Sequence, residues 1–215
     1  MTGPETRPIT SPLRSSDLAT LLRSRRSVRK YQDRPVERQQ LEQILEAARW
    51  APSPHGRQPW RFVVLTRPEA KAQLADQMGE SWQHNLQMDG QDEQIVHTRL
   101  TKSRQRISEA PAIIIPCLYL EDLDQYPDAR RQSDETTMAI QSLGAAVQNM
   151  LLMAYDLGLD TGWMCAPLFC PEVVCATLNL DTHLIPHALI TVGYAAADPQ
   201  RRPRLPLDTL IVHFD

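Results

Sequence analysis

The sequence predicts a single domain of the α/β or α+β class, in which helices and short apolar strands share one core. Three observations carry this prediction. The length of 215 residues suits one domain, several segments repeat apolar residues at the helical spacing, and short apolar runs of strand length lie between them. There is no internal repeat. We therefore expect residues 16–215 to form one domain, preceded by a flexible arm over residues 1–15.

The first third of the chain should contain three helices and one strand. Residues 17–25 should form a short first helix. A second helix opens at Pro35 and ends before Pro52, because apolar residues between them recur at i, i+3, i+4 and i+7. The apolar run from Arg61 to Thr66 has the length of a strand, and a helix from Pro68 through about residue 78 should follow it, since proline suits the first helical turn.

The middle of the chain should contain exposed helices, a buried strand and the longest helix. Residues 80–108 are polar and predict one or two exposed helices. The run from Ala112 to Leu120 is a buried strand, and Pro116 within it indicates an edge position or a bulge, because proline cannot donate to a ladder. Thr136 to Leu157 is the longest predicted helix. Its small residues 144–146 would allow another helix to approach, in the core, which is the simpler interpretation, or at a dimer seam.

The last third should add two strands and one helix. Leu159 to Ala166 is predicted as a strand, Pro171 starts a helix that continues through Leu178, and Ile185 to Tyr194 is a final core strand. The last twenty residues are rich in proline and arginine and should be extended.

The charge balance and the cysteine spacing argue against several classes of protein. A net charge of -3 disfavours a nucleic-acid binder, since such proteins concentrate positive charge. The four cysteines match no common zinc or cluster spacing, so we expect reduced thiols and no metal site. No apolar run reaches the length of a membrane helix, and the first fifteen residues lack the apolar core of a secretory signal. We expect a cytoplasmic protein with no membrane partner. The cysteines are Cys117, Cys165, Cys170 and Cys175.

A basic cluster is the first candidate site. Three guanidinium groups and one hydroxyl lie within the five residues from Arg25 to Arg29. An arginine fork matches the oxygens of a phosphate and keeps its proton, so this cluster predicts an anion clamp. The alternative is a solvated helix end whose arginines offset the helix dipole. Neither a G-x-G-x-x-G nor a P-loop motif is present, which disfavours the common nucleotide-binding folds.

Three further stretches give the basic cluster a context. They are Ala51–Phe62 (APSPHGRQPWRF), Gly158–Trp163 (GLDTGW) and Arg201–Pro206 (RRPRLP). With these stretches in order, the chain resembles the FMN-dependent nitroreductase family. The resemblance implies an α+β fold with a mixed, mostly antiparallel central sheet surrounded by helices. It also implies an intertwined homodimer with the flavin at the subunit interface, in which the C-terminal tail crosses to the partner.

The resemblance assigns roles to individual residues. Arg25 and Ser27, assisted by Arg26, would hold the phosphate and ribityl end of FMN. Arg29 would face N1 and O2 of the ring, where a fixed cation stabilises the negative charge of the reduced flavin. The loop from Pro52 to Gln58 would pack on the ring from the other subunit, although residues 54–56 depart from the usual family pattern. The implied FMN-binding residues are Arg25, Arg26, Ser27, Arg29, Pro52, Ser53, Pro54, His55, Gln58, Met164, Cys165, Ala166, Arg202 and Arg204.

Two side chains leave alternatives open. His55 is a candidate proton donor in catalysis, although a single loop histidine is more often a structural hydrogen-bonding group. Cys165 lies where the family presents backbone N–H groups to flavin N5 and O4, and a redox role for its thiol needs a partner or a depressed pKa. Late in the chain, Arg202 and Arg204 match the basic pair that closes over the phosphate.

The implied reaction is ping-pong. NADH or NADPH passes a hydride to N5 of FMN and leaves, and a nitroaromatic, a quinone or a related flat small molecule then takes the electrons. In the family, the segment corresponding to residues 80–108 covers the substrate side. No side-chain nucleophile and no pair of carboxylates are needed for this chemistry.

A closer likeness covers residues 20–212. The stretches YPDARR from Tyr126, GLDTGW from Gly158 and LFCPEVV from Leu168 look like the nitroreductase-like C-terminal domain of bacterial deazaflavin-coenzyme γ-glutamyl ligases. The ligase half is missing here, so the likeness implies an FMN site beside a pocket for a deazaflavin or another flat acceptor. The alternatives to an oxidoreductase are a non-catalytic flavin- or deazaflavin-binding accessory protein of such a ligase system and a structural dimer that has lost its flavin.

Overall fold

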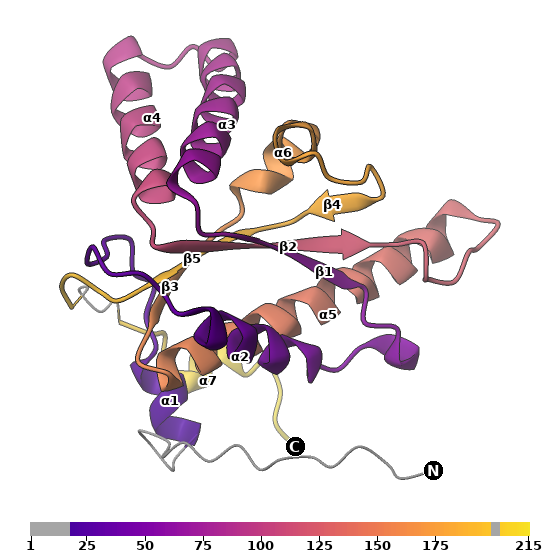
Figure 1. Cartoon of the computed structure of the whole chain (residues 1–215). Helices are drawn as coiled ribbons and strands as arrows, with labels where there is room; N and C mark the ends of the chain where they lie inside the picture. The colour runs from indigo at the N-terminus through magenta and orange to yellow at the C-terminus, as the bar shows by residue number, and fades with distance from the viewer. Residues whose placement is uncertain (1–17, 199–202) are drawn as a thin grey trace, which may run out of the picture.

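One five-stranded sheet carries helices on both of its faces (Figure 1). The computed structural model describes residues 18–198 and 203–215, so the expected arm over residues 1–15 lies outside the described residues. The helices are α1 (Leu18–Ser24), α2 (Arg38–Arg49), α3 (Pro68–Met88), α4 (Glu93–Ser108), α5 (Ala129–Asp156), α6 (Pro171–Leu178) and α7 (Leu207–Leu210), with 3-10 helices η1 (Pro54–Gly56) and η2 (Ala166–Phe169). The strands are β1 (Trp60–Leu65), β2 (Ala112–Tyr119), β3 (Asp160–Met164), β4 (Leu184–Pro186) and β5 (Leu189–Gly193).

The sheet is antiparallel between all of its named strands. Its order is β1-β2-β5-β3, and β4 pairs with β2 beside β5. A parallel bridge between Ser27 and Thr161 continues the sheet beyond β3, at its edge. The arrangement confirms the mixed, mostly antiparallel sheet that the sequence resemblance implies.

The apolar run of β2 packs against both helical layers. Figure 1 shows α2 and α5 on one face of the sheet and α3, α4 and α6 on the other. Because side chains alternate along a strand, Ile114 and Leu118 join the core under α2 and α5, whereas Ile113 and Ile115 join the core under α3, α4 and α6. This double burial explains why the strand is apolar at every position instead of at every second one.

The position of Pro116 shows that one part of the sequence prediction was wrong. β2 is an interior strand and not an edge strand, because β1 pairs on one side of it and β4 and β5 pair on the other. The expected bulge in β2 is absent, because β2 pairs with β1 without a break through Pro116, but an extra residue lies opposite Pro116 in the neighbouring strands. From the Ile114–Ile190 pair to the Cys117–Pro186 pair, β2 advances three residues and its neighbour four. The missing N–H of Pro116 falls at this irregularity, where ladder hydrogen bonds are interrupted.

Several helix boundaries differ from the expected ones. Helix α5 begins at Ala129, seven residues before the expected start, because the Asp128 carboxylate accepts a hydrogen bond from the backbone N–H of Arg131 at 3.0 Å. Helix α3 continues to Met88, and the expected final strand is divided into β4 and β5. The extra turns are polar, so hydrophobic periodicity alone does not detect them.

A buried lysine connects α3 to the end of α4. Lys71 is only 5% exposed, and its ammonium group donates to the backbone carbonyls of Ala110 and, at 3.1 Å, Pro111. Burial lowers the pKa of Lys71. The two hydrogen bonds satisfy carbonyls at the buried approach to β2 and offset the cost of placing an ammonium group in this position.

Replacing Lys71 by methionine is expected to destabilise the domain by about 1–3 kcal/mol, because the buried carbonyl of Ala110 loses its donor. Chemical denaturation measures the change. Lys102→Met on the exposed side of α4 is the matched control and should stay within about 0.5 kcal/mol of the wild type. Equal stabilities of the two variants would show that water replaces the lysine at no cost.

Candidate functional site

The basic cluster is fixed to the sheet through its one apolar residue. Val28 is 2% exposed, and its backbone N–H donates to Thr161 of β3 at 2.8 Å. Because side chains alternate along an extended segment, Ser27 and Arg29 lie on the side opposite Val28. Arg25 still belongs to the end of α1, since its backbone N–H donates to the Leu21 carbonyl at 3.1 Å. The sheet edge therefore exposes Ser27 and Arg29 directly after the helix end that carries Arg25. The anion clamp stays a prediction.

A close backbone approach holds this segment in place. A Cβ added to Gly162 in β3 would collide with the backbone oxygen of Val28 and lie 2.7 Å from Thr191 Oγ1. The Tyr31 hydroxyl shares a hydrogen bond with Thr191 Oγ1 at 2.6 Å and donates toward the Val28 carbonyl at 3.0 Å. Burial raises the pKa of Tyr31, which keeps the phenol neutral. Neither Gly162 nor Tyr31 was predicted as a site residue from the sequence, although Gly162 lies within the GLDTGW motif.

Arg25 has a buried nitrogen without a partner. Its Nε is buried and no described residue accepts a hydrogen bond from it. Burial and, secondly, the positive charge of Arg204 lower the pKa of Arg25. Two guanidinium groups therefore repel each other here while one keeps an unused donor. An anion between them would remove both penalties, so these residues fit a phosphate group.

Arg26, unlike Arg25, has partners for its guanidinium within the chain. Its guanidinium forms an ion pair with Asp198 at 2.8 Å, donates to the carbonyl of Ser24 at 3.0 Å and is 19% exposed. These contacts line a cavity of about 470 Å³, which Asp160 and Tyr155 also border. Burial raises the pKa of Asp160. A role of Arg26 at the phosphate stays a prediction, and the predicted ligand Arg202 lies outside the described residues.

Arg29 and the end of β3 offer unused donors. Arg29 is exposed, and no described residue forms an ion pair or hydrogen bond with its guanidinium. Met164 is the last residue of β3 and pairs with Leu189. The backbone N–H groups of Cys165 and Ala166, which follow, have no backbone acceptor among the described residues. Such donors suit the polar edge of a ligand that lies across the end of β3.

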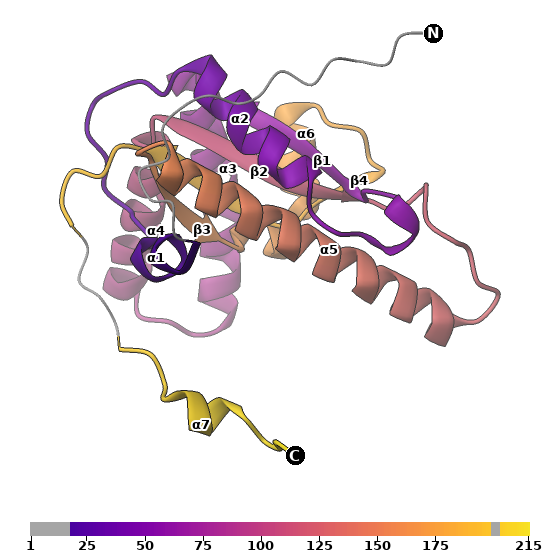
Figure 2. The same cartoon turned by 90° about the horizontal axis from the view of Figure 1, so that it is seen from below.

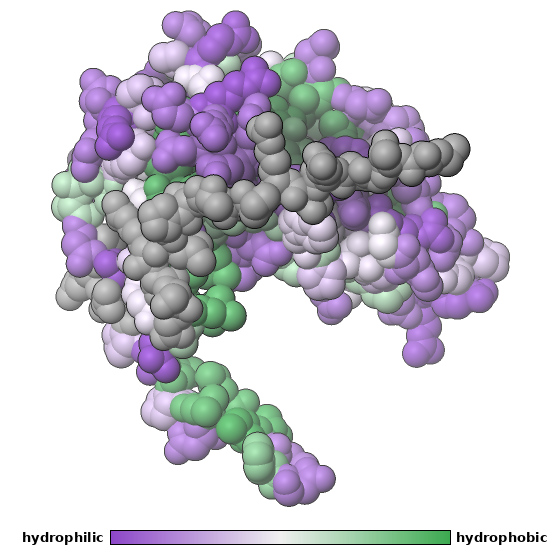
Figure 3. Space-filling model, turned by 60° about the horizontal axis from the view of Figure 1, so that its bottom comes forward, coloured by the Kyte–Doolittle hydropathy of each residue, from purple (hydrophilic) through white to green (hydrophobic). Residues whose placement is uncertain are grey.

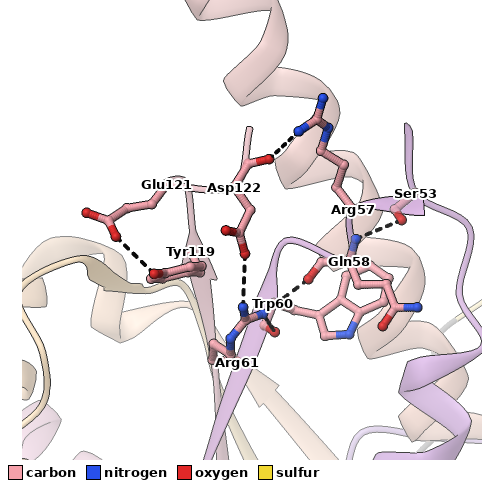
Figure 4. A network of polar contacts seen from close by, with 8 residues as sticks. All are labelled: Ser53, Arg57, Gln58, Trp60, Arg61, Tyr119, Glu121 and Asp122. Atoms are coloured by element: carbon pink, nitrogen blue, oxygen red, sulfur yellow. Dashed lines mark hydrogen bonds and ion pairs between the residues drawn. The ribbon is translucent and has the colours of Figure 1, made fainter. Parts of the chain in front are cut away.

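The predicted ring-packing loop has an unusual backbone. His55, Gly56 and Gln58 have φ values of 53°, 66° and 51°. The Ser53 hydroxyl accepts a hydrogen bond from the backbone N–H of Gln58 at 3.0 Å, and Arg57 reaches across to Asp122 (Figure 4). His55, like Pro52, is exposed, whereas Ser53 and Pro54 are half-buried. The loop thus has a defined shape while its tip faces solvent.

One chain does not bring this loop to the basic cluster. Figures 1 and 2 place η1, which forms the loop, and α1, which leads into the cluster, beside opposite parts of α5. Helix α5 has 28 residues, so it is about 42 Å long. The two predicted halves of the flavin site are therefore well separated within a single chain.

The C-terminal segment exposes its apolar side chains. Val212 and Phe214 are 101% and 86% exposed, and Leu207 is 71% exposed. Figure 3 shows this segment as an apolar projection that extends away from the body of the molecule. In water such a surface favours burial against another protein surface.

The described part of the chain, 18–198 and 203–215, contains neither a candidate metal site nor a candidate membrane helix. There, no three His, Cys, Asp or Glu side chains are grouped closely enough to hold a metal ion. No helix of that part is long and apolar enough to cross a membrane. The four cysteines are free thiols.

Comparisons with known proteins agree with this geometry. The sequence pattern of the nitroreductase family matches residues 22–194. A Thermus thermophilus protein named NADH dehydrogenase is 30% identical, over 91% of this chain and 95% of its own length. A Desulfovibrio desulfuricans crystal structure, of a protein assigned to the nitroreductases in complex with FMN, is 27% identical with a TM-score of 0.71 and covers 94% of this chain and 98% of the other.

A further structural comparison supports the fold alone. A BluB-like flavoprotein from Clostridium difficile is 21% identical, with a TM-score of 0.79 over 94% of this chain and all of the other. The match over residues 22–194 includes the basic cluster, the Ala51–Phe62 stretch and the GLDTGW motif, which are the residues that carry the resemblance in the sequence. The chain therefore belongs to the nitroreductase family.

Proposed function

We propose that the protein is an FMN-dependent oxidoreductase that takes electrons from NADH or NADPH and passes them to a flat small molecule such as a nitroaromatic or a quinone. The observation that carries the proposal is the unbalanced positive charge at Arg25, whose buried Nε has no partner among the described residues and whose neighbour Arg204 is also cationic. The FMN complex of the Desulfovibrio relative supports the same cofactor.

The residues of this chain would hold FMN along the edge formed by the basic cluster and β3. Arg25, Ser27 and Arg204 would bind the phosphate. The backbone N–H groups of Cys165 and Ala166 would donate to the polar edge of the ring. When bound, FMN supplies two-electron transfer in two half-reactions, first from the nicotinamide and then to the acceptor.

Arg29 and His55 would act on the charge and proton balance. The Arg29 guanidinium is exposed and has no ion pair or hydrogen bond with any described residue, so it would stabilise negative charge at the pyrimidine edge of the ring. His55 is exposed at the tip of its loop and would donate a proton there, with water as the alternative donor.

We also propose that the protein is a homodimer with the flavin at the subunit interface. The loop 53–58 and the basic cluster lie beside opposite parts of α5, so a complete site needs a loop from a second chain. The exposed apolar side chains of the tail provide a surface that a partner would cover. A twofold pairing gives two equivalent sites, each built from both subunits.

The test begins with the visible spectrum of the protein with added FMN, followed by NADH or NADPH without oxygen. Bound flavin that bleaches with either donor supports the proposal. In that case Arg29→Ala should slow bleaching more than it weakens FMN binding. Flavin that binds and stays oxidised with both donors would contradict the enzyme and favour an accessory binding protein, and failure to bind FMN at all would contradict both.

A further inference from the structure

Arg57 connects the ring-packing loop to the acidic loop that follows β2, residues 121–124. Its Nη1 donates to the backbone carbonyl of Asp122 at 2.6 Å, and its Nη2 forms an ion pair with the Asp124 carboxylate (Figure 4 shows the first contact). These two contacts use both ends of one planar guanidinium. The acidic loop is itself attached to the core, because Leu123 between them is 8% exposed. Arg57 therefore ties a solvent-facing loop to a fixed point.

A second arginine supports the same junction. Arg61, at the start of β1, donates to the carbonyl of Gln58 at 3.3 Å and forms an ion pair with Asp122 at 3.2 Å (Figure 4). It also lies 4.5 Å from the centre of the Tyr119 ring. Arg57 and Arg61, on either side of Gln58, thus both contact residues 119–124.

The backbone of the loop requires such support. His55 and Gln58 have side chains and yet adopt positive φ values of 53° and 51°, on either side of Arg57. Conformations of this kind cost free energy and persist only where surrounding contacts fix them. No acidic partner other than Asp124 forms an ion pair with Arg57 among residues 18–198 and 203–215. Loss of the Arg57 contacts would let residues 55–58 relax.

We propose that Arg57 is a positioning residue: it fixes the loop 53–58 of one subunit against the flavin that Arg25 of the other subunit holds. This inference rests on the proposed function. Arg57 does not contact the reacting atoms. It holds the loop tip, with His55, at a set distance from the ring in the neighbouring site, and the rate of electron transfer depends on that placement.

The first experiment compares Arg57→Ala and Asp124→Asn with the wild type in anaerobic bleaching by NADH or NADPH. Both variants are expected to slow bleaching by about 10- to 100-fold, because small misplacements of an active-site group have effects of this size. FMN affinity and Tm should change little. Arg38→Ala is the matched control, since Arg38 forms an exposed ion pair with Glu42 at 2.7 Å on α2. Arg57→Lys, which keeps the charge without the fork, should be slowed by an intermediate amount and serves if Arg57→Ala does not fold.

The second experiment mixes subunits of Arg25→Ala and Arg57→Ala, at an FMN concentration that fills wild-type sites only. If both residues serve the same site from different chains, a mixed dimer contains one site with neither substitution. With random mixing, about a quarter of all sites should then bleach at the wild-type rate. No recovery on mixing, with active wild type and confirmed mixed dimers, would place Arg57 in the site of its own chain and overturn the inference.

Failure of the inference is distinct from failure of the proposed function. If the bound flavin bleaches equally fast in the wild type and in Arg57→Ala, the proposed function stands and Arg57 has no positioning role. A wild-type protein that never bleaches with either donor would contradict the function itself, before any variant is compared.

Discussion

Arg25→Ala is expected to weaken FMN binding by about 10- to 100-fold, which corresponds to the loss of a charge-assisted contact worth roughly 1.5–3 kcal/mol. The reason is that Arg25 combines a neighbouring cation, Arg204, with a buried Nε for which residues 18–198 and 203–215 offer no partner. In the free protein this arrangement is unfavourable, and a phosphate relieves it. Quenching of FMN fluorescence on binding measures the dissociation constant.

Riboflavin provides the control for Arg25. It has the ring and the ribityl chain of FMN but no phosphate, so Arg25→Ala should leave its affinity nearly unchanged. Arg23→Ala, at an exposed arginine in the last turn of α1, should affect neither ligand. An equal loss of affinity for FMN and riboflavin would mean that Arg25 shapes the fold of the site instead of binding the phosphate.

The fold was largely predictable because its signals are local. The apolar stripe Leu41, Ile44 and Ala48 is buried in α2 as the helical spacing indicates, and the continuous apolar run of β2 is buried on both faces. The start of α5 was missed because its first two turns are polar and only the Asp128 cap marks them. The interior position of Pro116 depends on a bulge in a neighbouring strand some 70 residues away, which no local pattern contains.

The candidate site was predictable as a set of segments, but not as an arrangement. Arg25 and Arg26 are neighbours in the sequence, yet the Nε of Arg25 has no partner among the described residues, whereas Arg26 pairs with Asp198, 172 positions later. Arg57 lay within a quoted motif, yet its partner Asp124 is 67 positions away. Charged residues of either sign are common on surfaces, so the sequence cannot select these pairs. They depend on how the sheet edge and the loops meet.

Gly162→Ala is expected to destabilise the domain and to weaken FMN binding together. The added methyl group would collide with the backbone oxygen of Val28 and lie 2.7 Å from Thr191 Oγ1. Thr191 is buried in β5, so the segment around Val28 is the part that must move. Overpacking of this kind costs about 1–3 kcal/mol, which lowers the Tm of a domain of this size by roughly 3–10 °C.

Gly79→Ala separates this effect from the general effect of replacing glycine. Gly79 lies in α3 with nothing within 4 Å of an added Cβ, and alanine is the better helix former, so its Tm should rise slightly. The added FMN gives a second readout, because a ligand at free concentration L stabilises the folded state by RT ln(1 + L/Kd), so tighter binding raises Tm further. Gly162→Ala should lose part of that increase, since Arg25 and Ser27 move with Val28. If Gly162→Ala lowers Tm but FMN raises its Tm as much as that of the wild type, phosphate binding by the basic cluster does not depend on the attachment of Val28 to the sheet edge.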